Sequence, residues 1–271
     1  MTVMKKHKAS MPLLPAYQYA PPATIILVTF ADRLALIEDR IAAACRRTGR
    51  SRSDVRLMAV SKIHPAEAIV EAVSAGVTLF GENRVQEFES KRARLAELHV
   101  SAEVHLIAHL QSNKAAKAAA LFDAIDSVDS LRLAERLNEA ASKAAKTLPI
   151  LLELKLSDEV TKTGLDPHSA DLRVLLDRLS ALPNVVLRGL MTIAPFDDNP
   201  ETARACFRRL RMLRESLARD YPALDLRELS MGMSGDFEVA IEEESTLIRI
   251  GTALFGARPK PAPHPQTPPA P

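Results

Sequence analysis

The chain has 271 residues, enough for one large α/β barrel or for two smaller domains. With 47% hydrophobic and 26% charged residues, it has the composition of a globular protein. Its 36 basic and 34 acidic side chains give a net charge of +2, which excludes an overall polyelectrolyte character and gives no support to a nucleic-acid partner.

Residues 1–29 begin with basic residues, as the first part of a signal peptide does. Prolines at positions 12, 15, 21 and 22 interrupt the apolar part that would have to follow. The segment is therefore interpreted as a flexible extension rather than a targeting peptide. No apolar run reaches the length of about 18 residues that a membrane-spanning helix needs, so no membrane contact is expected.

A helix is expected over residues 30–49, where Leu34, Ile37 and Ile41 share one face and Gly49 follows the last turn. Beyond it, strand-length apolar runs alternate with helical segments. The eight runs cover residues 55–62, 77–83, 104–111, 124–130, 150–157, 185–195, 227–234 and 247–251.

Eight strands that each precede a helix predict parallel pairing and a (β/α)₈ barrel. An open doubly wound sheet is the rival, but such a sheet usually carries a glycine-rich turn after its first strand, and this turn has no glycine. The scarce glycines lie mostly in or beside the second, sixth, seventh and eighth runs. They indicate either close backbone approach to a ligand or ordinary turns.

The cysteines, two histidines and an arginine-rich segment give little indication of function. Cys45 and Cys206 lie in helical patterns without metal or disulfide spacing, so a reducing, cytoplasmic setting is expected. His105 and His109 have no third ligand, so no metal is expected. The arginine-rich segment 204–220 is interpreted as a solvated helix face rather than a nucleic-acid surface.

Lys62 ends the first run, at the barrel end where active sites form. A lysine in a partly dry site loses affinity for its proton, and the neutral amine reacts with aldehydes. Schiff-base chemistry is therefore one interpretation of Lys62, and a surface lysine just beyond the strand is the other.

A phosphate site is predicted from the last two runs. Ser234 and Gly235 precede a helical segment that opens at Asp236, while Gly251 and Thr252 follow the eighth run. Arg249 is two residues before Gly251 on a strand, so its side chain is expected to point into the barrel, toward a ligand or toward a carboxylate partner. An amine, a phosphate cup and an inward arginine together suit an aromatic aldehyde phosphate such as pyridoxal 5′-phosphate.

Six segments carry a resemblance to a known family: LMAVSK (57–62), LFGENRVQE (79–87), LQSNK (110–114), RGLMTIAPF (188–196), SMGMSGD (230–236) and IRIGTALFGAR (248–258). Through them the chain resembles the pyridoxal phosphate homeostasis proteins, which are single-domain barrels of the alanine-racemase-like class. The resemblance implies a cofactor-binding barrel of pyridoxal phosphate fold type III over residues 30–258, without a C-terminal β-domain. Residues 259–271 are expected to form a disordered, proline-rich tail.

The resemblance also implies the cofactor-binding residues. They are Lys62 for the Schiff base, Ser234, Gly251 and Thr252 for the phosphate, Arg249 for the pyridine nitrogen, and Asn83 and Met191 beside the ring. The chain departs from the family pattern at Ala108, Lys155 and Glu244, where the family usually has glycine, asparagine and glycine. Lys155 is expected to alternate inward with Glu153, and Glu244 is expected to face solvent.

A non-catalytic carrier or buffer of pyridoxal phosphate is the predicted function. The chain ends soon after the eighth run, and none of Tyr17, Tyr19 and Tyr221 follows a strand, so no second acid or base is identified. An arginine cannot protonate the pyridine nitrogen, which weakens the ring as an electron sink. The predicted carrier is a monomer that contacts apo-enzymes transiently. An amino-acid racemase and a Schiff-base aldolase are the alternatives.

Overall fold

The computed structural model describes residues 28–157 and 163–256. The predicted proline-rich tail and almost all of the predicted N-terminal extension lie outside these ranges, so both stay predictions. Thr29 is described. Its hydroxyl accepts the backbone N–H of Asp32, and the Asp32 carboxylate accepts the N–H of Thr29, so this pair begins the first helix.

Eight parallel strands close into a barrel in chain order. They are β1 (Arg56–Val60), β2 (Leu79–Glu82), β3 (Glu103–Leu106), β4 (Ala124–Val128), β5 (Leu148–Glu153), β6 (Val185–Met191), β7 (Glu228–Ser230) and β8 (Leu247–Ile250). Pairing of β1 with β8 completes the ring, for example between Met58 and Arg249. The predicted (β/α)₈ barrel is confirmed.

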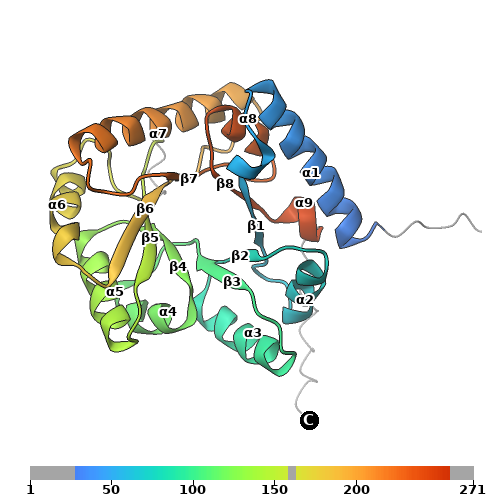
Figure 1. The fold of residues 1–271 in the computed structure, drawn as a ribbon, viewed down its shortest axis with the longest axis horizontal. Helices are drawn as coiled ribbons and strands as arrows, with labels where there is room; N and C mark the ends of the chain where they lie inside the picture. Colours follow the sequence, from blue (N-terminus) through green and yellow to red (C-terminus); the bar gives the residue numbers. More distant parts are fainter. Residues whose placement is uncertain (1–27, 158–162, 257–271) are drawn as a thin grey trace, which may run out of the picture.

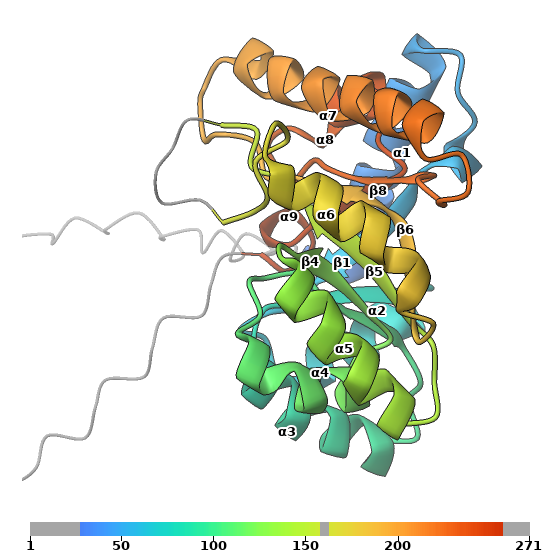
Figure 2. The ribbon, with the colours of Figure 1, turned by 90° about the vertical axis from the view of Figure 1, so that its left-hand side faces the viewer.

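The helices form a ring outside the strands (Figure 1), and Figure 2 shows α7, α6 and α5 following one another along one side. The α-helices are α1 (Phe30–Arg47), α2 (Ala66–Ser74), α3 (Val85–Glu97), α4 (Ala115–Leu121), α5 (Leu131–Lys143), α6 (Ala170–Arg178), α7 (Pro200–Asp220), α8 (Phe237–Glu242) and α9 (Thr252–Phe255). Three short 3₁₀ turns are η1 (Arg52–Asp54), η2 (Ser112–Lys114) and η3 (Leu179–Ala181).

Each strand is shorter than the apolar run that predicts it. The sixth run, for instance, extends to residue 195, whereas β6 ends at Met191. The last residues of the runs leave the ladder and form loops at the carboxyl ends of the strands, where barrel enzymes bind their ligands.

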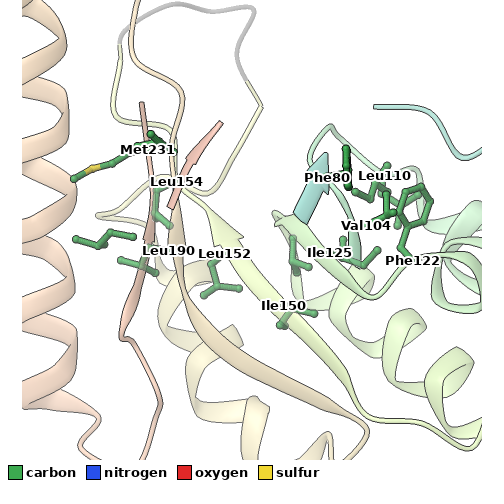
Figure 3. Packing of buried hydrophobic residues seen from close by; sticks show 14 of the residues in the cluster. Phe80, Val104, Leu110, Phe122, Ile125, Ile150, Leu152, Leu154, Leu190 and Met231 are labelled. Carbon is green, nitrogen blue, oxygen red and sulfur yellow. The ribbon is translucent and has the colours of Figure 1, made fainter. Parts of the chain in front are cut away.

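Apolar side chains fill two layers. Those on the outer face of the strands pack against the helices, and Figure 3 shows Ile150 and Leu152 of β5 and Leu190 of β6 among them. Inside the barrel, a smaller cluster forms a floor across its middle. This floor layer consists of Met58, Leu79, Leu151, Met191 and Leu247, with Ile107 packed against it.

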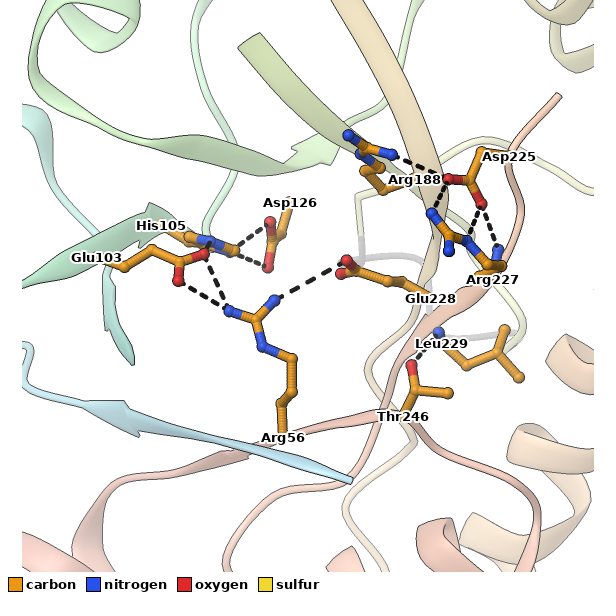
Figure 4. Close-up of polar contacts among 10 residues, drawn as sticks. All are labelled: Arg56, Glu103, His105, Asp126, Arg188, Asp225, Arg227, Glu228, Leu229 and Thr246. Atoms are coloured by element: carbon orange, nitrogen blue, oxygen red, sulfur yellow. Dashed lines mark hydrogen bonds and ion pairs between the residues drawn. The ribbon is translucent and has the colours of Figure 1, made fainter. Parts of the chain in front are cut away.

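Charged side chains gather at the amino ends of the strands, around a cavity of about 560 Å³. Figure 4 shows His105 between Glu103 and Asp126, with ring nitrogens 2.9 Å and 3.1 Å from their carboxylates. Arg56 lies 2.9 Å from Glu103 and 3.9 Å from Glu228. Residues at this end of a barrel usually serve stability rather than catalysis.

Two glycines, one in β6 and one just after β7, are required by the chain itself rather than by a ligand. A Cβ at Gly189 would lie 1.9 Å from the carbonyl oxygen of Glu228 on the adjacent β7. A Cβ at Gly232 would lie 2.6 Å from the Ala240 Cβ of α8. The close backbone approach expected from the glycine pattern is present, but at these two positions the neighbour is protein.

Candidate functional site

A cavity of about 770 Å³ opens at the carboxyl ends of the strands. Six of the seven predicted site residues line it, from the ends of four different strands. They are Lys62, Asn83, Ser234, Arg249, Gly251 and Thr252. The barrel brings these distant positions together because every parallel strand delivers its carboxyl end to the same mouth.

Met191 is the exception. It points into the barrel, but it is buried in the floor layer and is not among the residues that line the cavity. The resemblance implied a place for Met191 beside the ring, whereas the structure places its side chain in the floor layer. The residues that reach the cavity from this segment are Ile193, Ala194 and Pro195, beyond the end of β6.

Lys62 and Asn83 follow two neighbouring strands, β1 and β2. Val60 of β1 pairs with Gly81 of β2, so each polar residue follows its paired position by two residues. Lys62 is partly buried in the turn after β1, and Asn83 is partly buried directly after β2. The amine and the amide therefore occupy the same side of the cavity.

The loops after β7 and β8 form the part of the mouth on the other side of β1, since β8 pairs with β1. The Ser234 hydroxyl lies 3.5 Å from the backbone nitrogen of Ala253, a long contact that joins the two loops. A Cβ at Gly235 would meet nothing within 4 Å, so packing does not demand a glycine there and the space beside it is open. Small residues with exposed backbone N–H groups and hydroxyls suit an anion.

Asp236 is an acidic group beside this cup. Its carboxylate accepts the backbone N–H of Met233 at 2.5 Å, which closes the loop before α8. Burial raises the pKa of Asp236 above its ordinary value. Asp236 lines the same cavity as Ser234, Gly251 and Thr252, and sequence analysis did not identify it as a site residue.

Arg249 lies at the base of the cavity and is only 4% exposed. Its guanidinium donates to the Ser230 hydroxyl at 2.6 Å and to the Thr192 carbonyl at 2.8 Å. Burial lowers the pKa of Arg249 below its ordinary value, although nearby acids oppose the shift. Within residues 28–157 and 163–256 no carboxylate forms an ion pair with it, so the structure does not show the carboxylate partner considered as an alternative.

The wall at the ends of β3 and β5 carries polar groups to which the sequence assigned no role in the site. The His109 Nδ1 lies 2.8 Å from the Asp129 carboxylate, and His109 lines the cavity. Glu153 is 5% exposed and accepts the Thr163 hydroxyl at 2.8 Å. Burial raises the pKa of Glu153. The sequence feature that could have identified His109 as a site residue is its position shortly after a barrel strand.

The three departures from the family pattern lie in different places. Ala108 lines the cavity, whereas Lys155 is not among the lining residues. Glu244 has a φ of 68°, a left-handed conformation that favours glycine. Its side chain is 46% exposed and pairs with Arg211 and Arg214 of α7, away from the cavity. These contacts agree with the expectation that Glu244 faces solvent.

The sequence predicts neither a membrane-spanning helix nor a metal site. Within the described residues, no helix is long and apolar enough to cross a membrane, and no group of His, Cys, Asp and Glu side chains could hold a metal ion. The two cysteines, Cys45 and Cys206, are buried in α1 and α7.

Known proteins share this fold and sequence. The family described as the alanine racemase N-terminal domain matches residues 33–259. The pyridoxal phosphate homeostasis protein of Aquifex aeolicus is 43% identical over 227 residues, which cover 84% of this chain and 97% of the relative. PipY of Synechococcus elongatus, solved with PLP bound, has a TM-score of 0.74 and 45% identity over 84% of this chain and 100% of its own.

More distant barrels agree in fold alone. The alanine racemase of Clostridium difficile has a TM-score of 0.65 at 15% identity, and the match covers 84% of this chain but 58% of the racemase. The homeostasis proteins, by contrast, match over nearly their whole length. This chain belongs to the pyridoxal phosphate homeostasis protein family.

Proposed function

We propose that this protein binds pyridoxal 5′-phosphate reversibly at the carboxyl-end cavity and acts as a carrier or buffer of the cofactor rather than as an enzyme. The proposal includes a monomeric, cytoplasmic protein that contacts apo-enzymes transiently. The observation that carries it is the placement of Lys62 in one cavity with Arg249 and with the loops after β7 and β8.

The cavity suits the three chemical parts of this cofactor. Ser234, Gly235, Gly251 and Thr252 offer small donors and open space for a phosphate. Apolar side chains also line the cavity, as suits a planar aromatic ring. These side chains include Val60, Ile107, Ile193 and Met233.

Different residues of the chain would bind different parts of the cofactor. The cofactor supplies an aldehyde that condenses with a primary amine and releases water. Lys62 provides that amine from the turn after β1. Arg249 is held by Ser230 and Thr192, and its guanidinium would serve the ring nitrogen as a hydrogen-bond donor that keeps its own proton. The cup after β7 and β8 would hold the phosphate.

The same arrangement favours binding over rapid turnover. A donor that keeps its proton leaves the ring nitrogen unprotonated, and an unprotonated pyridine stabilises a carbanion poorly. Arg249 therefore supports slow chemistry on the ring rather than an efficient electron sink, although pyridoxal phosphate enzymes also use arginine as the partner of this nitrogen.

The second candidate is a slow exchange of amino-acid α-protons. One observation favours it, the His109–Asp129 pair at 2.8 Å on the cavity wall, because an imidazole oriented by a carboxylate can carry a proton. Incubation with L-amino acids in deuterated water tests this candidate. Deuterium incorporation that disappears on His109→Asn would favour it over the carrier.

The visible spectrum of the purified protein after addition of pyridoxal phosphate tests the main proposal. Wild type is expected to show an absorbance band that persists through gel filtration, and Lys62→Ala should lose it. Lys117→Ala is the control, because Lys117 pairs with Glu89 on the outer helices. A wild-type protein that leaves the column colourless would overturn the proposal.

A further inference from the structure

The turn that carries Lys62 has a strained backbone. The His64 N–H donates to the Ser61 carbonyl at 3.1 Å, so Lys62 and Ile63 occupy the two central positions of the turn. Ile63 has a φ of 63°, a left-handed conformation that is unfavourable for a β-branched residue. Such a conformation persists only where surrounding contacts impose it.

A second lysine lies directly behind this turn. Lys91 of α3 is 7% exposed, and its ammonium lies 2.8 Å from the Glu82 carboxylate and 2.8 Å from the Glu87 carboxylate. Glu82 is fully buried, and the same oxygen that meets Lys91 accepts the Ser61 hydroxyl at 2.6 Å. We call Glu82, Glu87 and Lys91 the buried lysine cluster.

The buried lysine cluster is bonded to both peptide groups that flank Lys62. On one side, the Lys91 ammonium donates to the Ser61 carbonyl at 3.0 Å. On the other side, the Ile63 N–H donates to the Glu87 carboxylate at 2.6 Å. These two bonds fix the direction in which the Lys62 side chain leaves the backbone.

Packing alone does not explain a lysine at position 91. Its helical neighbours Phe88 and Leu95 are buried apolar residues on the same face of α3, so an apolar side chain could continue that face. Burying an ammonium with two carboxylates has a large desolvation cost, and ion pairs of this kind often stabilise no more than apolar residues do. The cluster therefore calls for a role beyond stability.

We propose that Lys91 is a positioning residue for Lys62: with Glu82 and Glu87 it holds the strained turn so that the Lys62 amine faces the cavity. This inference rests on the proposed function, because it names the device that orients the amine for the aldehyde. It assigns a task to a charged cluster that does not itself line the cavity.

Four variants test the positioning role. Lys91→Met removes the ammonium, and Glu87→Ala removes the acceptor of the Ile63 N–H at a less buried position. Glu87→Gln keeps an acceptor oxygen and is the conservative rescue. Lys117→Met is the matched control, since it removes a lysine that also pairs with a glutamate of α3 but at the surface.

Two readouts are needed. The first is the dissociation constant for pyridoxal phosphate from the visible band, which is expected to rise about tenfold or more in Lys91→Met and Glu87→Ala and less than about threefold in Glu87→Gln. The second is the pH profile of trace acetylation of Lys62 in ligand-free protein, read by peptide mass. It should shift in the same two variants and stay unchanged in Lys117→Met.

The outcomes separate the two proposals. Folded Lys91→Met or Glu87→Ala protein with wild-type affinity and a wild-type acetylation profile would overturn the positioning role. If Lys91→Met fails to fold, the milder Glu87→Ala decides. If wild type binds no pyridoxal phosphate, the proposed function fails, yet the acetylation profile still tests whether the cluster orients Lys62.

Discussion

At the scale of single residues, the candidate site combines attraction and repulsion for an anion. The cup formed by Ser234, Gly251 and Thr252 lies in the same cavity as Asp236, whose carboxylate closes the loop before α8. A phosphate bound in this cup would share the cavity with the negative charge of Asp236. A carrier that must also release its ligand gains from such a limit on affinity.

Asp236→Asn tests this repulsion. The amide oxygen can still accept the Met233 N–H, so the loop should stay closed while the charge is lost. We expect the variant to bind pyridoxal phosphate about three- to tenfold more tightly near neutral pH. Because burial raises the pKa of Asp236, wild type loses the same charge as pH falls, and the difference should shrink. A weaker variant across the whole pH range would contradict this role.

Sequence analysis reached those positions that depend on a single strand. Lys62 ends the first apolar run and Arg249 lies within the eighth, and the structure brings both to the mouth. The resemblance implied Met191 beside the ring, whereas Met191 lies in the floor layer. Sequence analysis also could not identify Lys91, because its role depends on contacts among α3, β2 and the turn after β1. The spacing of Glu87 and Lys91 is only a local hint.

At the scale of elements, one glycine is required by strand packing and another leaves space in the cavity. Gly189 lets β6 approach β7, since any Cβ there would strike the backbone of Glu228 at 1.9 Å. Gly235 faces open space in the cavity. The same substitution should therefore affect stability at Gly189 and cofactor binding at Gly235.

Gly189→Ala should lower the free energy of unfolding by at least about 3 kcal/mol, because a backbone clash in a barrel cannot relax through side-chain movement. Gly235→Ala should change it by less than about 1 kcal/mol and should instead weaken cofactor binding by occupying the open space. Chemical denaturation and cofactor titration of both variants measure the two effects. Equal loss of stability in both would contradict the assignment.

At the scale of the whole molecule, the floor layer separates two polar ends of the barrel. The carboxyl end holds the candidate site, and the amino end holds the network around His105 (Figure 4). Burial alone would lower the pKa of His105, but Asp126 and Glu103 outweigh that effect and raise it to about 10. The hydrogen bond from His105 contributes most to lowering the pKa of Glu103 to about 2.

These shifts give the stability a defined pH dependence. A raised histidine pKa adds stability that is complete below the unfolded value of about 6.5 and is lost as pH rises toward 10. A lowered glutamate pKa adds stability that is complete above the unfolded value of about 4.5 and is lost as pH falls toward 2. The network should therefore stabilise the fold most between about pH 4.5 and 6.5.

His105→Asn tests this dependence by denaturation at pH 5.5 and at pH 9.5, with His168→Asn as the exposed control. The variant should be clearly less stable than wild type at the lower pH, and the gap should narrow at the higher pH. A gap that stays constant would mean that packing, rather than charge, accounts for His105.

The order of strands and helices made the barrel predictable, because eight apolar runs with helical segments between them admit few other architectures. The amino-end network was not predictable in the same way. Its members come from β1, β3, β4 and β7, and no local pattern relates a strand's first residue to the strand opposite. The spacing of His105 and His109 in fact concealed that they serve opposite ends of the barrel.

The most direct test of the account is borohydride reduction of the wild-type protein with pyridoxal phosphate, followed by peptide mass analysis. The account predicts a single pyridoxyl group on the amine of Lys62. This label should be absent when the protein is denatured first, and its amount should fall when inorganic phosphate competes for the site. Label spread over exposed lysines, or concentrated on a lysine outside the carboxyl-end cavity, would contradict it.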